Sequence, residues 1–158
     1  MNILVLCTGN SARSILLESI FNTHGAGRVR AYSAGSNPTG KVHPQSLALL
    51  AELGHDTSGA RSKSWDEFAG AEAPEMNIVI TVCASAAGET CPVWPGAPLR
   101  AHWGVEDPAA AGQPDWDAAF RTAYSTLEKR AKALLALPFE TMAPAELSQL
   151  LKRIGDIA

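Results

Sequence analysis

The sequence predicts one small α/β domain in which four parallel strands form a sheet with helices on both faces. Short strand-like apolar runs alternate with helical patterns along the chain, which is typical of a parallel sheet. Two of these runs, 3–6 and 77–82, are continuously or nearly all apolar, as strands covered on both faces are. The length of 158 residues is enough for one domain with a sizeable core. No internal repeat or second domain interrupts residues 1–158, so we treat them as a single domain.

The first half of the chain contains two predicted strands and three predicted helices. Residues 3–6 form a buried strand, and residues 13–24 form a helix with one apolar face. Residues 28–33 alternate weakly and form the second strand. Residues 44–53 form a helix that begins at a proline and ends before a glycine. A short helix is expected within residues 61–70, around a tryptophan and a phenylalanine.

The second half supplies the remaining strands and helices. Residues 77–82 are β-branched and nearly all apolar, and they give the strongest strand signal. A loop rich in Gly, Pro and small residues follows at 84–98, and residues 99–103 form the fourth strand. Helices are predicted at 115–137 and 144–154. This order of elements fits a small doubly wound, flavodoxin-like architecture.

A cysteine stands at the carboxyl end of the first strand, where ligands bind in such sheets. The segment from Cys7 to Ser14 reads Cys-Thr-Gly-Asn-Ser-Ala-Arg-Ser and leads directly into a helix. Loop amides and a helix N-terminus attract anions, and they favour ionisation of a thiol. The segment therefore predicts a loop that holds a tetrahedral oxyanion against the Cys7 thiolate. The candidate oxyanion-binding residues are Thr8, Gly9, Asn10, Ser11, Ala12, Arg13 and Ser14.

Individual side chains of this loop suit the same chemistry. Arg13 offers a planar pair of donors for two anion oxygens. Gly9 tolerates a positive φ and close backbone approach, and Asn10 tolerates left-handed geometry while its amide holds the loop. Ser11 and Ser14 can donate hydrogen bonds to the thiolate or the loop. The alternative, a buried core cysteine at position 7, explains none of these neighbours.

Composition narrows the class of protein. The net charge of −3 gives no electrostatic reason to expect nucleic acid or anionic membranes as partners. No apolar run approaches the ~18 residues of a membrane span, and no signal peptide precedes the first strand. We therefore expect a cytoplasmic protein. Three cysteines are an odd number, which suits catalytic or buried thiols better than a disulfide framework.

Three segments resemble the low-molecular-weight tyrosine phosphatase superfamily, and within it most of all the arsenate reductases. They are the Cys7–Ser14 motif, Tyr-Ser-Ala-Gly at 32–35 and His-Trp-Gly-Val-Glu-Asp-Pro at 102–108. The resemblance covers residues 1–137, which leaves 138–158 as a helical tail. It implies that Cys7 and Arg13 are catalytic, with Asp107 as general acid.

The resemblance also implies a redox role for the other two cysteines. Reductases of this fold carry a cysteine at the end of the third strand and another in the following loop, and Cys83 and Cys91 match them. Arsenate reduction needs two electrons, which thiols supply by forming a disulfide. Cys83 would attack the arsenic adduct of Cys7, and Cys91 would then attack Cys83. Thioredoxin, or glutathione with glutaredoxin, would close the cycle as external thiol reductant, with no bound cofactor.

The segment after Asp107 favours a small substrate. Phosphatases usually follow this motif with aromatic residues that frame an aryl group, whereas Ala109–Ala111 stand here. Arsenate is therefore the expected substrate, with phosphate or sulfate as competing oxyanions. Position 84 is Ala where related reductases are commonly acidic, and this leaves the electron donor open. Trp103 is expected to be a packing residue, and Lys63 a solvated lysine near the active site.

Three alternatives remain beside the reductase. A low-molecular-weight phosphatase acting on phosphotyrosine or small aryl phosphates would use the same loop and Asp107. A non-catalytic oxyanion-binding protein would need neither the cysteine nor the acid. No metal ligand set is expected, because Cys83, Cys91 and His102 do not make a complete set at zinc spacing.

Overall fold

The computed structural model describes residues 1–83 and 98–158. Cys91 and all but the last residue of the loop expected at 84–98 lie outside the described residues. Four strands lie in these described ranges: β1 (Asn2–Leu6), β2 (Arg30–Ala34), β3 (Ile78–Thr81) and β4 (Leu99–His102). The α-helices of the same residues are α1 (Arg13–His24), α2 (Pro44–Glu52), α4 (Trp116–Leu135) and α5 (Pro144–Gly155). The described part also contains four short 3-10 helices, η1 (Trp65–Phe68), η2 (Pro108–Ala110), η3 (Gln113–Asp115) and η4 (Phe139–Thr141).

All four strands are parallel and lie in the order β2-β1-β3-β4. The chain runs outward from β1 to β2, then crosses back to the other side of β1 to form β3. This reversal of strand order lies between β1 and β3, where α/β sheets bind their ligands. Leu6 pairs with Ala34 on one side and with Thr81 on the other. The predicted α/β fold class is therefore confirmed, and Cys7 leaves β1 beside the reversal point.

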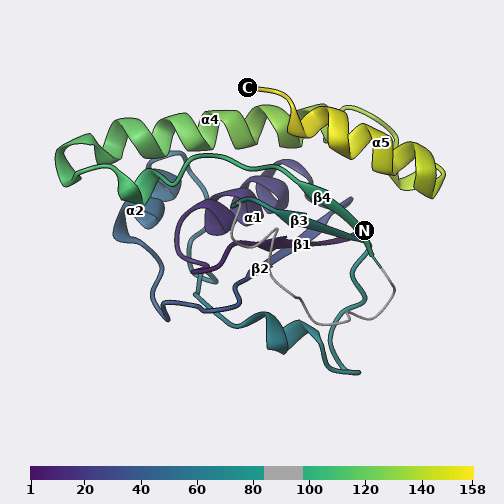
Figure 1. Ribbon diagram of the computed structural model, residues 1–158, viewed down its shortest axis with the longest axis horizontal. Helices are drawn as coiled ribbons and strands as arrows, with labels where there is room; N and C mark the ends of the chain where they lie inside the picture. Colours follow the sequence, from purple (N-terminus) through teal and green to yellow (C-terminus); the bar gives the residue numbers. More distant parts are fainter. Residues whose placement is uncertain (84–97) are drawn as a thin grey trace.

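Helical elements cover both faces of the sheet (Figure 1). On one face α1 packs along β1 and β2, while α5 packs against β4. The rings of Phe21 and Trp103 join these two helical regions at 5.9 Å. On the opposite face η1 lies below the sheet, where Phe68 contacts Tyr32 of β2 at 5.5 Å.

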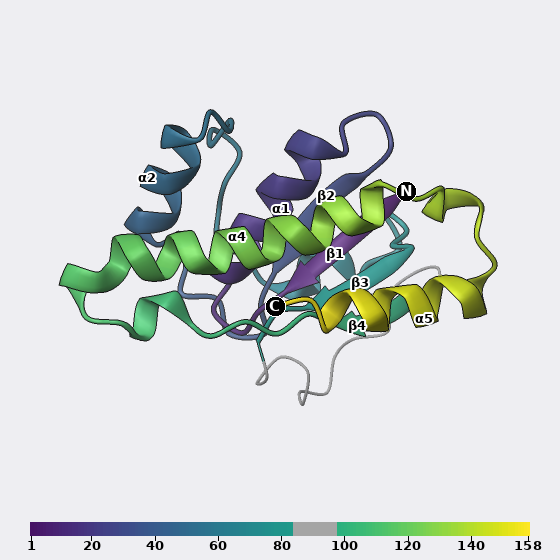
Figure 2. The same cartoon turned by 90° about the horizontal axis from the view of Figure 1, so that it is seen from above.

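The C-terminal segment packs on the sheet beside α4 (Figure 2). Apolar residues of α5 at 3- and 4-residue spacing are buried, as an amphipathic helix requires: Leu147, Leu150, Leu151 and Ile154. The indole Nε1 of Trp103 donates a 2.9 Å hydrogen bond to the Leu151 carbonyl. Trp103 is fully buried, so its predicted packing role is confirmed.

Predicted element bounds differ from the observed ones by a few residues at the ends. β2, predicted at 28–33, begins two residues later, because Arg28 and Val29 belong to a turn that bonds back to Gly25. The helix expected within 61–70 is reduced to η1. Within the part of the chain that the structure describes, no helix is long and apolar enough to span a membrane.

Candidate functional site

Residues 7–14, the oxyanion loop, connect the end of β1 to the start of α1. The Cys7 amide donates to the Ala34 carbonyl at 3.2 Å, so the loop begins while its backbone still bonds to β2. The sequence suggested that Gly9 and Asn10 both tolerate left-handed geometry, and the positive φ of 44° falls on Asn10. A Cβ at Gly9 would meet only ordinary van der Waals contact. The left-handed bend therefore depends on an asparagine, one of the few non-glycine residues that adopt it readily.

Asn10 holds the loop through both ends of its side-chain amide. Its Nδ2 donates to Ser14 Oγ at 2.9 Å, and its Oδ1 accepts from the Lys63 backbone amide at 2.9 Å. Ser62 Oγ donates to the Gly9 carbonyl at 3.1 Å. The predicted structural role of the Asn10 amide matches these contacts, which tie the loop to a segment about 53 residues farther along the chain.

A second segment supports the opposite side of the loop. The amides of Thr39 and His43 donate to the carbonyls of Gly9 and Ser11, each at 3.1 Å. Ser11 Oγ donates outward to the Lys41 carbonyl, not toward the thiol. The carbonyls of Gly9 and Ser11 are thus bonded outward, whereas within the loop the Asn10 amide donates to the Cys7 carbonyl at 3.2 Å.

Gly35 is a functional position whose role the sequence did not reveal. A Cβ there would lie 2.3 Å from the Thr8 carbonyl oxygen and 2.5 Å from that of Cys7. Only glycine lets the end of β2 approach the loop so closely. Gly35 is the last residue of the Tyr-Ser-Ala-Gly segment, and its requirement follows from a contact between separate segments.

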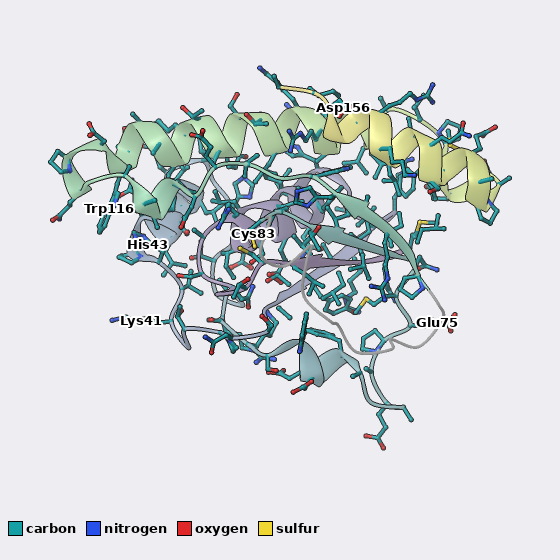
Figure 3. The ribbon with its side chains drawn as sticks, viewed as in Figure 1. Lys41, His43, Glu75, Cys83, Trp116 and Asp156 are labelled. Atoms are coloured by element: carbon teal, nitrogen blue, oxygen red, sulfur yellow. The ribbon has the colours of Figure 1, made fainter. Side chains whose placement is uncertain are left out.

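Two thiols meet at the loop. Cys7 and Cys83 are both reduced and buried. The Thr8 amide donates to Cys83 Sγ at 3.4 Å, so the third strand delivers its sulfur to the loop itself. Cys83 lies near the centre of the molecule in Figure 3, while His43 and Trp116 lie toward one end. The Val82 amide donates to the Leu6 carbonyl. Cys7 follows Leu6 and Cys83 follows Val82, so each cysteine comes directly after one partner of this hydrogen bond.

The acidity of Cys7 differs from the sequence expectation. A hydrogen bond with the Cys83 thiol and burial raise the pKa of Cys7 above its ordinary value, while Arg13 and the Gly9 amide act to lower it. The loop and helix terminus alone led us to expect a lowered pKa, and this was wrong for the paired thiols. Two neighbouring thiols titrate as a coupled pair, so the charge of one thiolate disfavours ionisation of the other thiol.

Arg13 and Asp107 approach each other above the loop. Arg13 Nη1 donates to the Val105 carbonyl at 3.0 Å, and Nη2 lies 3.9 Å from Asp107 Oδ2. The buried Arg13 Nε has no hydrogen-bond partner in the described part of the chain, so this donor is available to an oxyanion. Asp107 Oδ1 accepts from the Ala109 amide at 3.0 Å, which caps η2. Its side chain is 44% exposed. Asp107 therefore caps η2 and is still accessible at the site.

Lys63 is not solvated, contrary to the sequence expectation. Only 8% of the residue is exposed, and its Nζ donates to the Arg61 carbonyl at 3.1 Å. Burial lowers the pKa of the Lys63 ammonium, while Glu18 on α1 and Glu67 act to raise it. Sequence reasoning could not show this burial, because it depends on contacts between distant parts of the chain.

The described residues thus bring together the oxyanion loop, the Cys7 thiol, a second thiol in contact with it and a carboxylic acid beside the arginine. Cys7 follows β1, Arg13 begins α1, Cys83 follows β3 and Asp107 lies in the segment after β4. Cys91 lies outside the described residues. This set can perform attack on an oxyanion with acid assistance, and the second thiol adds a route to a disulfide.

Known proteins are similar to this chain in sequence and in fold. The model of the low molecular weight phosphotyrosine protein phosphatase family matches residues 2–149. An arsenate reductase of Halalkalibacterium halodurans is 36% identical over 129 residues, covering 80% of this chain and 89% of that protein. A glutaredoxin arsenate reductase of Synechocystis sp. is 29% identical over 134 residues, covering 85% and 95%. A solved structure described as an arsenate reductase in the phosphate binding state aligns with a TM-score of 0.70 at 29% identity, covering 85% of this chain and 96% of that one.

Proposed function

The chain belongs to the low molecular weight phosphotyrosine protein phosphatase family, and we propose that within this family it is an arsenate reductase. The observation that carries the proposal is the contact between the Cys7 and Cys83 thiols at the oxyanion loop. Phosphoester hydrolysis needs one nucleophilic thiol, because water completes that reaction. Reduction of arsenate needs a second thiol within reach of the first.

In the first step arsenate would bind in the oxyanion loop. The amides of residues 8–13, the N-terminus of α1 and Arg13 would share its negative charge. The Cys7 thiolate would attack arsenic, and Asp107 would donate a proton to the oxygen that leaves as water. The product is a Cys7–arsenate thioester in which arsenic is still pentavalent. An arriving oxyanion would also compete with Cys83 Sγ for the Thr8 amide.

In the second step Cys83 would attack Cys7 Sγ. A bond forms between the two sulfurs while the sulfur–arsenic bond breaks, and its electron pair moves to arsenic. Arsenic is thereby reduced from the pentavalent to the trivalent state, and arsenite leaves with the proton that Cys83 loses. Adjacent parallel strands lie ~4.8 Å apart, which suits the Cα separation of ~5.5–6 Å in most disulfides. Leu6 pairs with Thr81, so Cys83 lies one residue beyond the position opposite Cys7.

An external dithiol would return the enzyme to its reduced state by thiol–disulfide exchange. The similarity to a glutaredoxin arsenate reductase supports a thiol protein as transient partner. Thioredoxin, or glutathione with glutaredoxin, fits this role, and Cys91 would relay the disulfide by attacking Cys83. Such a cycle requires a reducing compartment, so we place the protein in the cytoplasm. Phosphate and sulfate would compete with arsenate for the loop.

Assays of two activities on one variant test the proposal. Wild-type protein is supplied with arsenate and each thiol system in turn, and separately with an aryl phosphate. Cys83→Ser should abolish multiple turnover with arsenate but retain hydrolysis of the aryl phosphate, because only reduction requires a second thiol. Full arsenate turnover by Cys83→Ser, or a wild type that hydrolyses the ester and never reduces arsenate, would contradict the proposal and favour a phosphatase.

A further inference from the structure

We infer that Arg130 is a positioning residue that holds the segment carrying Asp107 in place. Its guanidinium joins this acid segment, residues 104–107, to the terminal segment, residues 155–158. Arg130 does not belong to the oxyanion loop, and it would act on the reaction through Asp107. The inference rests on the proposed function only in treating Asp107 as the general acid.

Two arginines bind successive carbonyl groups of the acid segment. Arg130 Nη1, from α4, donates to the Gly104 carbonyl at 3.2 Å. Arg13 Nη1, from α1, donates to the Val105 carbonyl at 3.0 Å. The Val105 amide in turn donates to the Val82 carbonyl at 3.2 Å. The backbone just before the carboxylic acid is therefore held by contacts from α1, α4 and the end of β3.

The other donor of the Arg130 guanidinium binds the terminal segment. Its Nε donates to the Ile157 carbonyl at 2.9 Å, where the chain returns to α4 (Figure 2). Only 6% of Arg130 is exposed. A buried guanidinium needs acceptors for its donors, because an unmatched buried polar group costs free energy. The two carbonyls therefore keep Arg130 in one place, and a movement of the terminal segment would be passed on to Gly104.

Close packing fixes the terminal segment against the residues that precede the acid segment. A Cβ at Gly155 would lie 2.8 Å from the His102 carbonyl oxygen and 3.1 Å from Trp103 Cδ1. The Trp103 indole also donates to the Leu151 carbonyl of α5. The terminal segment thus packs on the same backbone that leads into the acid segment, which gives Arg130 a fixed anchor.

A pocket beside Arg130 gives the acid segment room to move. Its volume is about 750 Å³, and its lining includes Gly104 and Asp107 on one side and Ala123 and Arg130 of α4 on the other. Packing on α4 therefore does not fix the acid segment along its whole length, and the Arg130 hydrogen bond spans the two elements. The η2 cap orients the Asp107 side chain locally, whereas Arg130 would set the place of the whole segment.

The leaving group of an aryl phosphate tests the inference without any redox step. Phenol leaves poorly without a proton donor, whereas p-nitrophenol leaves readily as its anion. Lysine at position 130 keeps the charge but lacks the planar fork that reaches two carbonyls. In Arg130→Lys we expect kcat/KM for phenyl phosphate to fall about tenfold, because a general acid acts only when it is positioned. The loss for p-nitrophenyl phosphate should be much smaller.

The Asp107→Asn background shows whether Arg130 acts through the acid. In this background Arg130→Lys should cause no further loss with phenyl phosphate, because no proton donor remains to be misplaced. The phosphate Kd, measured by calorimetry, should stay close to wild type in Arg130→Lys, since the oxyanion loop has supports of its own. Arg121→Lys is the matched control on α4: this arginine is 43% exposed and should leave every value unchanged.

Two further measurements approach the acid segment by other routes. Gly155→Ala would push the terminal segment away from His102, and it should show the same difference between the two esters. It also provides the test if Arg130→Lys does not fold. Amide hydrogen exchange at Val105 should accelerate in Arg130→Lys and not in Arg121→Lys, whether or not the protein turns over either ester.

Four outcomes would overturn the inference. Equal losses with the two esters would make Arg130 purely stabilising. Additive losses in the Arg130→Lys, Asp107→Asn double variant would show that Arg130 acts by another route. A rise in phosphate Kd as large as the loss in kcat/KM would place the effect in the oxyanion loop, and unchanged exchange at Val105 would show that the segment is not held by Arg130. A wild type that hydrolyses both esters and never reduces arsenate would overturn the proposed function and leave these results unaltered.

Discussion

The two halves of the candidate site are held very differently. The oxyanion loop is bonded to two separate segments, around His43 and around Lys63, and Gly35 packs against its backbone. Asp107 has a local cap on η2 and a 3.9 Å approach to Arg13, and nearly half of its side chain is exposed. The difference teaches that the anion-binding half depends on tertiary packing, whereas the acid depends on local turn chemistry. Variants in the first half should affect folding and binding together, and variants in the second should affect turnover alone.

The largest effect is expected for Gly35→Ala. The new Cβ would meet the carbonyl oxygens of Thr8 and Cys7 at less than 3 Å, so the loop must shift. Overpacking of this kind costs about 3 kcal/mol, or roughly 6–12 °C in Tm for a domain of this size. Thermal unfolding and phosphate titration should show a lower Tm and weaker binding together.

Gly59→Ala is the matched control for this change, because nothing lies within 4 Å of the added Cβ. It should leave both Tm and phosphate binding close to wild type. A Gly35→Ala protein that binds phosphate with the wild-type Kd would contradict the claim that close packing at Gly35 shapes the oxyanion loop.

Asp107→Asn should separate turnover from stability. Asparagine caps a helix about as well as aspartate, so η2 and the Tm should be retained. Loss of the proton donor should lower the single-turnover rate of arsenate reduction about 100-fold, within the usual range for general acids. Rapid-quench measurement of disulfide formation gives this rate, with Glu106→Gln as the neighbouring control. An unchanged rate would remove Asp107 from the chemistry.

The Cys83→Ala variant tests how the second thiol affects the pKa of Cys7. Because the hydrogen bond with Cys83 is the largest cause that raises the pKa of Cys7, its removal should lower that pKa. The alkylation rate of Cys7, followed by peptide mass as pH rises, should therefore reach its midpoint at a lower pH than in wild type. A midpoint that stays in place or rises would show that burial, rather than the thiol pair, controls the acidity of Cys7.

Much of the fold could be predicted from sequence because its signals are local. Strands β1 and β3 are apolar runs of restricted length, and the helices follow apolar periodicity. Cys7, Arg13 and Asp107 were predicted for a similar reason, since each belongs to a short motif. The support beneath the loop could not be predicted, because it depends on contacts across the fold. In the sequence Lys63 looks like an ordinary surface lysine, yet it is buried and its amide bonds to Asn10; Gly35 looks like an ordinary turn glycine.

The acidity of Cys7 shows the same limit within the site. The loop amides and the helix terminus are local features, and considered alone they predict an acidic thiol. The opposing effect comes from Cys83, 76 residues along the chain, and its size depends on how closely β3 brings the second sulfur. A motif can therefore identify the candidate nucleophile, Cys7. The pKa of this thiol also depends on Cys83, which a separate segment places beside it.

The central claim is that Cys83 supplies the second thiol in arsenate reduction. Cys91→Ser protein is reduced, freed of reductant and exposed to arsenate for one turnover, and its disulfides are then mapped by peptide mass. The account predicts a Cys7–Cys83 disulfide and one equivalent of arsenite. Arsenite formed while Cys83 remains a free thiol would contradict it.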